Sequence, residues 1–128
     1  MTRTTRLLLD THVFLWWRSN DARLGQEGLD AIGTANAVFV SAASAWEAAI
    51  KRAIGRLRIP EPFEEGIRDS GFNALPIHFD HAEKVGELPP HHSDPFDRLL
   101  VAQAQVEGFT LVTHDRTLAS YDVPLIRI

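Results

Sequence analysis

Five acidic side chains stand directly after short apolar runs or at the starts of helical patterns. In an open α/β sheet, ligands bind outside the carboxyl ends of the strands, so these are the positions where chemistry is expected. Several carboxylates in one crevice repel one another, and a divalent cation removes that penalty. Such a site can activate water and cleave a phosphodiester bond. The five residues are Asp10, Glu47, Asp94, Asp97 and Asp115.

Three of these acids also fit a purely structural role at the start of a helix. Asp10 is placed to N-cap a helix that begins at the next residue, and Asp115 precedes a short helical turn. Glu47 follows Ser44 by three residues, the spacing of a capping box. Taken singly, each acid is better explained as a cap than as a catalyst. Because helix starts beside strand ends face one crevice, the two roles are compatible.

Asp94 and Asp97 open the clearest helical pattern of the chain. Asp94 before Pro95 is the complete signature of an N-cap followed by a proline in the first turn, so capping is the favoured interpretation of Asp94. Asp97 lies in the first turn, where the helix dipole favours negative charge. With no cysteine in the chain, an oxygen-only ligand set favours Mg²⁺ or Mn²⁺ over zinc.

The elements that must position these acids predict an α/β fold of three layers. Apolar β-type runs alternate with helical patterns, which predicts a mainly parallel central sheet of four to five strands flanked by helices. The expected strands are Arg6–Leu9, Ala37–Val40, Ala74–Ile77, Phe109–Thr113 and Leu125–Ile128. The expected helices are Thr11–Arg18, Gly25–Ala35, Ser44–Gly55, one opened by Pro60 and Pro62 and ending near Gly71, Asp80–Glu87, and Pro95–Glu107.

Composition limits the class of protein. The 128 residues predict a single domain over positions 1–128, and the hydrophobic share of 45% is typical of a soluble globular chain. No apolar stretch is long enough to span a bilayer, and the absence of cysteine fits a reducing compartment, so we expect a cytoplasmic protein. The net charge of −4 argues against a basic nucleic-acid-binding surface, although a bound cation can recruit phosphate to an acidic protein.

Four ordered motifs together resemble the PIN-domain nucleases, and within that family the VapC-type toxins. The resemblance covers nearly the whole chain, and its most specific part is the stretch that runs from Asp94 to Leu100. The motifs are Leu-Leu-Asp10-Thr-His, Val-Ser41-Ala-Ala-Ser-Ala-Trp-Glu47, His-Ser-Asp94-Pro-Phe-Asp97-Arg-Leu-Leu-Val-Ala-Gln-Ala and Leu-Val-Thr113-His-Asp115.

The resemblance implies a PIN-like fold and a role for each polar residue of these motifs. It implies Mg²⁺, with Mn²⁺ as the alternative, bound by Asp10, Glu47, Asp97 and Asp115, with Asp94 as an outer-shell helper. It also implies that hydroxyl groups orient ligands or water, from Thr11, Ser41 and Thr113. Arg98 has two interpretations beside this set: it contacts a substrate phosphate, or it neutralises the acidic cluster.

The expected function is that of a metal-dependent endoribonuclease, the toxin of a toxin–antitoxin pair. The resemblance implies an RNA substrate, a cognate antitoxin and a homodimer. One alternative is a catalytically silent binding module that kept the PIN fold. A second is a phospho-acceptor of the receiver class, which would need an acidic pair after the first strand, whereas Thr11 and His12 follow Asp10.

Two further segments allow more than one interpretation. His91 and His92 beside Asp94 would suit a transition metal, but three adjacent residues rarely close round one ion, so a solvated loop at the rim of the site is favoured. The four residues Phe14–Trp17 are unusually apolar for a short helix. Such a helix is either buried throughout or covered by a partner, and the family resemblance favours the partner.

Overall fold

A parallel β-sheet forms the centre of the molecule. The computed structural model describes residues 5–59 and 61–128, and within them five strands run in the order β3-β2-β1-β4-β5, with every neighbouring pair parallel. The predicted parallel sheet is confirmed. The strands are β1 (Arg6–Leu9), β2 (Ala37–Ser41), β3 (Asn73–Leu75), β4 (Thr110–Thr113) and β5 (Leu125–Arg127).

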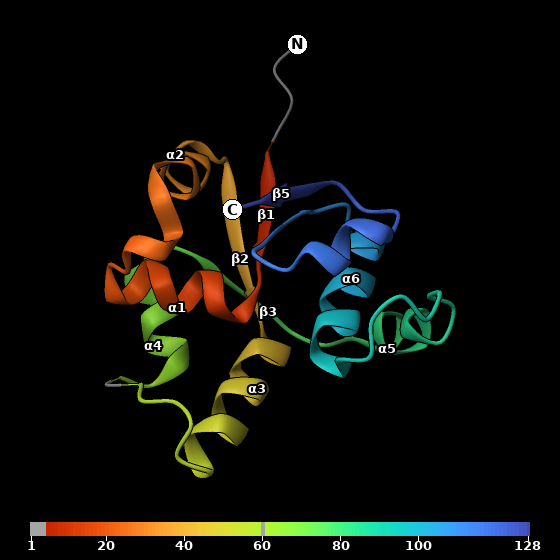
Figure 1. The fold of residues 1–128 in the computed structure, drawn as a ribbon, viewed down its shortest axis with the longest axis horizontal. Coiled ribbons are helices and arrows are strands. Elements are labelled where there is room, and N and C mark those ends of the chain that lie inside the picture. The colour runs from red at the N-terminus through yellow and green to blue at the C-terminus, as the bar shows by residue number, and fades with distance from the viewer. Residues whose placement is uncertain (1–4, 60) are drawn as a thin grey trace.

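Helices cover both faces of the sheet, which confirms the three layers (Figure 1). One face packs against α1 (Thr11–Ser19), α2 (Gly25–Thr34) and α4 (Phe63–Asp69). The other packs against α5 (Phe79–Val85), α6 (Pro95–Glu107) and the 3₁₀ turn Arg116–Ser120. The remaining helix, α3 (Ala42–Ala53), continues directly from β2. A second 3₁₀ turn, Ala22–Leu24, was not predicted from the sequence.

The central strand β1 shows why the strands are apolar throughout. Leu7 and Leu9 belong to the core under α1, Leu8 belongs to the core under α6, and none of the three is exposed. Side chains alternate between the faces of a strand, so a strand covered on both sides needs an apolar residue at every position. Asp10 is the first residue beyond this run, and it therefore emerges at the carboxyl edge of the sheet.

The start of α3 differs from the sequence prediction in a way that affects the site. The helix begins at Ala42, because the Ser41 hydroxyl accepts a hydrogen bond from the Ala43 N–H at 2.9 Å and caps it. The predicted capping box between Ser44 and Glu47 is therefore wrong. Other boundaries shift by one to three residues, and Pro60 lies outside the described residues.

The apolar stripe of α3 faces away from the sheet. Trp46, Ile50 and Ile54 are 56%, 42% and 61% exposed, whereas the inward side of the helix carries small residues and Glu47. The helical spacing was predicted correctly, but only the packing reveals that this outer stripe stays largely exposed, with the Trp46 ring edge-on against Phe96 at a centroid distance of 4.8 Å.

The Phe14–Trp17 segment of α1 packs mainly inward, unlike the exposed stripe of α3. Phe14 and Trp16 are buried in the core beneath α1, and Leu15 and Trp17 are partly buried against the same core. Phe14 also packs on Phe63, with ring centroids 5.0 Å apart. One side of the segment is therefore core, and coverage of its partly exposed side, at Leu15 and Trp17, by a partner stays a prediction.

Truncation of the central strand tests this architecture. We expect Leu8→Ala to lower the free energy of unfolding by about 2–5 kcal/mol, because it removes a fully buried side chain and leaves a cavity. The matched control is Leu29→Ala, whose leucine is 40% exposed and should cost less than about 1 kcal/mol. Equal losses in urea denaturation would contradict the described core.

Candidate functional site

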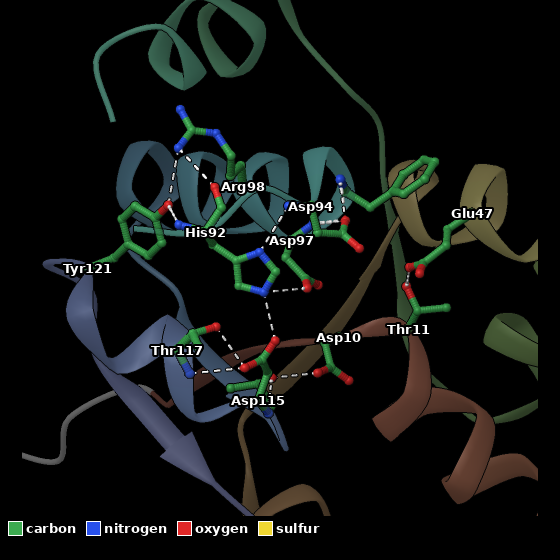
Figure 2. A network of polar contacts seen from close by, with 12 residues as sticks. Asp10, Thr11, Glu47, His92, Asp94, Asp97, Arg98, Asp115, Thr117 and Tyr121 are labelled. Atoms are coloured by element: carbon green, nitrogen blue, oxygen red, sulfur yellow. Dashed lines mark hydrogen bonds and ion pairs between the residues drawn. The ribbon is translucent and has the colours of Figure 1, made fainter. Parts of the chain in front are cut away.

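All five predicted acids line one open pocket of about 700 Å³ at the carboxyl end of the sheet. Asp10 follows β1, Asp115 follows β4, Glu47 comes from α3 and Asp97 from the first turn of α6. The predicted convergence is confirmed, and Figure 2 shows the carboxylates of Asp10, Asp97 and Asp115 close to one another around the same space. Their roles as metal ligands stay a prediction.

Asp10 serves as a helix cap and as a wall of the pocket at once. Its Oδ1 accepts a hydrogen bond from the Val13 N–H at 2.8 Å, as predicted for the N-cap of α1. Its Oδ2 accepts one from the Thr113 hydroxyl at 2.6 Å, so Thr113 orients this acid. Burial raises the pKa of Asp10, although both hydrogen bonds act in the opposite direction.

Glu47 is held by donors from two helices. The Thr11 hydroxyl donates to Glu47 Oε1 at 2.6 Å, and Lys51 one turn later donates to Oε2 at 2.8 Å. Thr11 has a single hydroxyl proton, so its 3.0 Å contact with Ser44 requires the Ser44 hydroxyl to donate. The sequence predicts Ser44 as a helix cap. In the structure α3 begins at Ala42, and the Ser44 hydroxyl contacts Thr11 instead.

Asp97 is a second acid of the pocket whose pKa is raised. Burial raises its pKa to about 7, and the nearby carboxylates of Asp94, Asp10 and Glu47 raise it in the same direction. Asp94 itself caps α6, since its Oδ1 accepts hydrogen bonds from the backbone N–H groups of Phe96 and Asp97. The pocket therefore concentrates negative charge that its own residues do not balance.

His92 lies inside the site, which corrects the prediction of a solvated rim. Its Nε2 is 2.8 Å from Asp115 Oδ2 and 3.5 Å from Asp97 Oδ2 (Figure 2). Burial raises the pKa of Asp115, but hydrogen bonds from His92 and Thr117 outweigh it, so the pKa lies below its usual value. His91, by contrast, is exposed as predicted.

Two expectations for polar residues are corrected. Arg98 does not neutralise the acidic cluster: it points away from the pocket and donates to the carbonyls of Val85, Leu88 and Pro89 and to the Tyr121 hydroxyl. Ser41 is fully buried, and its hydroxyl oxygen accepts the hydrogen bond that caps α3. Thr11 and Thr113 orient carboxylates, as predicted for hydroxyl groups of this site.

Comparison with known proteins shows the family to which the chain belongs. A family model described as PIN domain matches residues 7–124. The chain belongs to the PIN-domain family. Ribonuclease VapC22 of Mycobacterium tuberculosis (strain ATCC 25618 / H37Rv) is a relative with 34% identity, and the match covers 94% of this chain and 95% of that protein.

Two solved structures of bacterial proteins have a similar fold. VapBC2 from Rickettsia felis, bound to a DNA fragment from its promoter, has a TM-score of 0.72 at 15% identity, covering 96% of this chain and 98% of that chain. A toxin–antitoxin complex from Klebsiella pneumoniae has a TM-score of 0.63 at 18% identity, covering 95% and 99%. At such identities the likeness establishes the fold.

The raised pKa of Asp97 predicts how stability depends on pH in the metal-free protein. The folded state keeps the Asp97 proton up to about pH 7, whereas the unfolded chain releases it near its usual value of 3.8. The free energy of unfolding should therefore fall as pH rises from 4 to 7, with a slope from this group of at most about 1.4 kcal/mol per pH unit.

Denaturation in chelator at several pH values measures that slope. Asp97→Asn carries no titrating group at this position and should make the slope shallower, with the contribution of Asp10 remaining, and the variant should be the more stable protein at pH 7.5. A wild type and variant with parallel pH profiles would contradict the charge crowding described for Asp97.

The position of Arg98 predicts a loss of stability from a substitution that keeps its charge. A lysine has one donor atom and cannot span the carbonyls that the guanidinium joins, so Arg98→Lys should cost about 1–3 kcal/mol. Arg116→Lys, at an exposed arginine on the pocket rim, is the control and should change little. Equal thermal unfolding of both variants would argue against the described contacts.

Proposed function

We propose that this PIN-domain protein is a metal-dependent endoribonuclease that acts as the toxin of a toxin–antitoxin pair. The observation that carries the proposal is the meeting of Asp10, Glu47, Asp97 and Asp115 in one pocket. The name of the relative from Mycobacterium tuberculosis, a ribonuclease, supports the same activity, and the description of the Klebsiella structure supports the pairing.

The donor set of the pocket fits Mg²⁺, with Mn²⁺ as the alternative. The carboxylates of Asp10, Glu47, Asp97 and Asp115 offer oxygen ligands. The raised pKa of Asp97 means that burial and the neighbouring acids disfavour its negative charge, which a bound cation would stabilise. Asp94 also lines the pocket and is the proposed outer-shell helper, with its Oδ1 accepting the two hydrogen bonds that cap α6. A divalent cation bound there supplies the positive charge that phosphodiester hydrolysis requires.

The protein's own residues prepare the pocket for such a cation and for an RNA phosphate. Thr113 and Thr11 each donate a hydrogen bond to one carboxylate, which leaves the second oxygen of Asp10 or Glu47 to the helix cap or to Lys51. Orientation is thereby set before substrate arrives, and preorganised charge is the main contribution a protein makes to this chemistry.

An antitoxin and a second copy of the chain are the proposed protein partners. The outer stripe of α3, which includes Trp46, Ile50 and Ile54, is an exposed apolar surface of the kind that partners cover. The Phe14–Trp17 segment offers less apolar surface, because Phe14 and Trp16 belong to the core. Homodimerisation stays a prediction.

The described residues contain no helix that is long and apolar enough to cross a membrane. A cytoplasmic location stays a prediction.

The substitution Asp97→Asn tests the catalytic proposal. Asparagine keeps the size of the side chain but removes one anionic oxygen, so the pocket should bind Mg²⁺ more weakly and RNA cleavage should fall by at least 100-fold. If Asp97 served only the start of α6, activity would be near normal, because asparagine is also tolerated there. The assay measures cleavage of structured RNAs with Mg²⁺, with Mn²⁺ and with chelator.

The matched control is Asp80→Asn, which makes the same change in the first turn of α5, outside the pocket. This variant should cleave like wild type. A wild type that cleaves RNA equally well in chelator would contradict the metal-dependent mechanism. A wild type that binds Mg²⁺ but cuts no RNA would favour a silent binding module, and labelling by acetyl phosphate would instead indicate a phospho-acceptor.

A further inference from the structure

The loop before α6 is held in one conformation by an arginine and a tyrosine. The Arg98 guanidinium donates to the carbonyls of Pro89 and Val85 at 2.9 and 3.1 Å, and to the Tyr121 hydroxyl at 3.1 Å. The same hydroxyl accepts a hydrogen bond from the backbone N–H of His92 at 3.0 Å. The backbone of His92 is therefore fixed from outside the pocket.

The ring of His92 is fixed by a second backbone group. Its Nδ1 accepts a hydrogen bond from the Asp94 N–H at 2.9 Å. A backbone N–H can only donate, so Nδ1 must offer a lone pair and cannot carry a proton. The neutral imidazole consequently holds its proton on Nε2.

That Nε2 proton faces the carboxylates. Nε2 lies 2.8 Å from Asp115 Oδ2 and 3.5 Å from Asp97 Oδ2, and Figure 2 shows the ring between the two acids. The three atoms also have the closeness of a metal cluster, which would make His92 a nitrogen ligand. A ligand needs a lone pair on Nε2, however, and the hydrogen bond at Nδ1 places the proton there instead.

We propose that His92 is a positioning residue, whose Nε2–H donates to Asp115 beside Asp97 and holds the acidic pair ready for a cation without ligating it. The inference rests on the proposed function for the identity of the cation. It assigns Arg98 and Tyr121 the task of holding the histidine loop, which explains why an arginine directly follows Asp97.

The first test needs no metal and no RNA. A long-range ¹H–¹⁵N correlation spectrum of the metal-free protein at pH 7.5, with the His92 signals assigned from a variant, reports which ring nitrogen is protonated. We expect a proton on Nε2 and none on Nδ1. A protonated Nδ1 would overturn the proposal.

Two variants separate the two hydrogen bonds of the ring. Glutamine carries its amide nitrogen as far from Cβ as Nε2, so His92→Gln can still donate to Asp115. Asparagine places an acceptor where Nδ1 stands but is too short to reach Asp115. By calorimetry, His92→Asn should weaken Mg²⁺ binding about 10- to 100-fold, the usual effect of losing an outer-shell partner. His92→Gln should recover most of that loss.

His91→Asn is the control, because it removes the exposed neighbour in the same loop and should leave Mg²⁺ binding unchanged. A His92→Asn variant that binds Mg²⁺ like wild type would overturn the positioning role. Pulsed electron paramagnetic resonance of the Mn²⁺-loaded protein supplies the other decision: a ¹⁴N coupling lost in His92→Gln would show direct ligation and overturn the proposal.

Failure of the proposed function has a different signature. A wild type that binds neither Mg²⁺ nor Mn²⁺, yet shows the proton on Nε2, would overturn the metal-dependent activity and still support the hydrogen bond from His92 to Asp115.

Discussion

Repulsion between carboxylates held away from water is the constraint on which this pocket depends. Asp97 feels burial and three neighbouring acids, and its pKa rises to about 7. The chain places neutral donors around the acids, and Lys51 is the cation that contacts Glu47. Hydroxyl and imidazole N–H groups fix the directions of the oxygens without cancelling their charge. The pocket is thus ordered and electrostatically incomplete, which is the state that a divalent cation completes.

At Asp10, the helix cap and the contact that orients the carboxylate in the pocket use different oxygens. One oxygen caps α1, and the other accepts from Thr113. Burial raises the pKa of both Asp10 and Asp97, so each of these acids destabilises the fold when it ionises.

The helix that carries Glu47 also joins the pocket to the surface. Its inward side is made of small residues, so α3 approaches the sheet and α1 closely enough for Thr11 to reach Glu47. Its outward side is the exposed stripe with Trp46, one residue before Glu47. A partner that covers α3 would therefore sit beside the acids.

The sequence by itself determined the parallel three-layer fold, the strand-end acids and the caps at Asp10 and Asp94, because these depend on periodicity and on neighbours along the chain. It could not determine which side of α3 faces the core, since Trp46 and Ile50 have the same spacing whether buried or exposed. The sequence also predicted His92 on the rim of the site, and Arg98 beside a substrate phosphate or the acidic cluster. Only the tertiary structure decided those two, because the ring of His92 and the guanidinium of Arg98 are directed by Tyr121, Asp115 and the loop carbonyls, groups that meet only after the chain has folded.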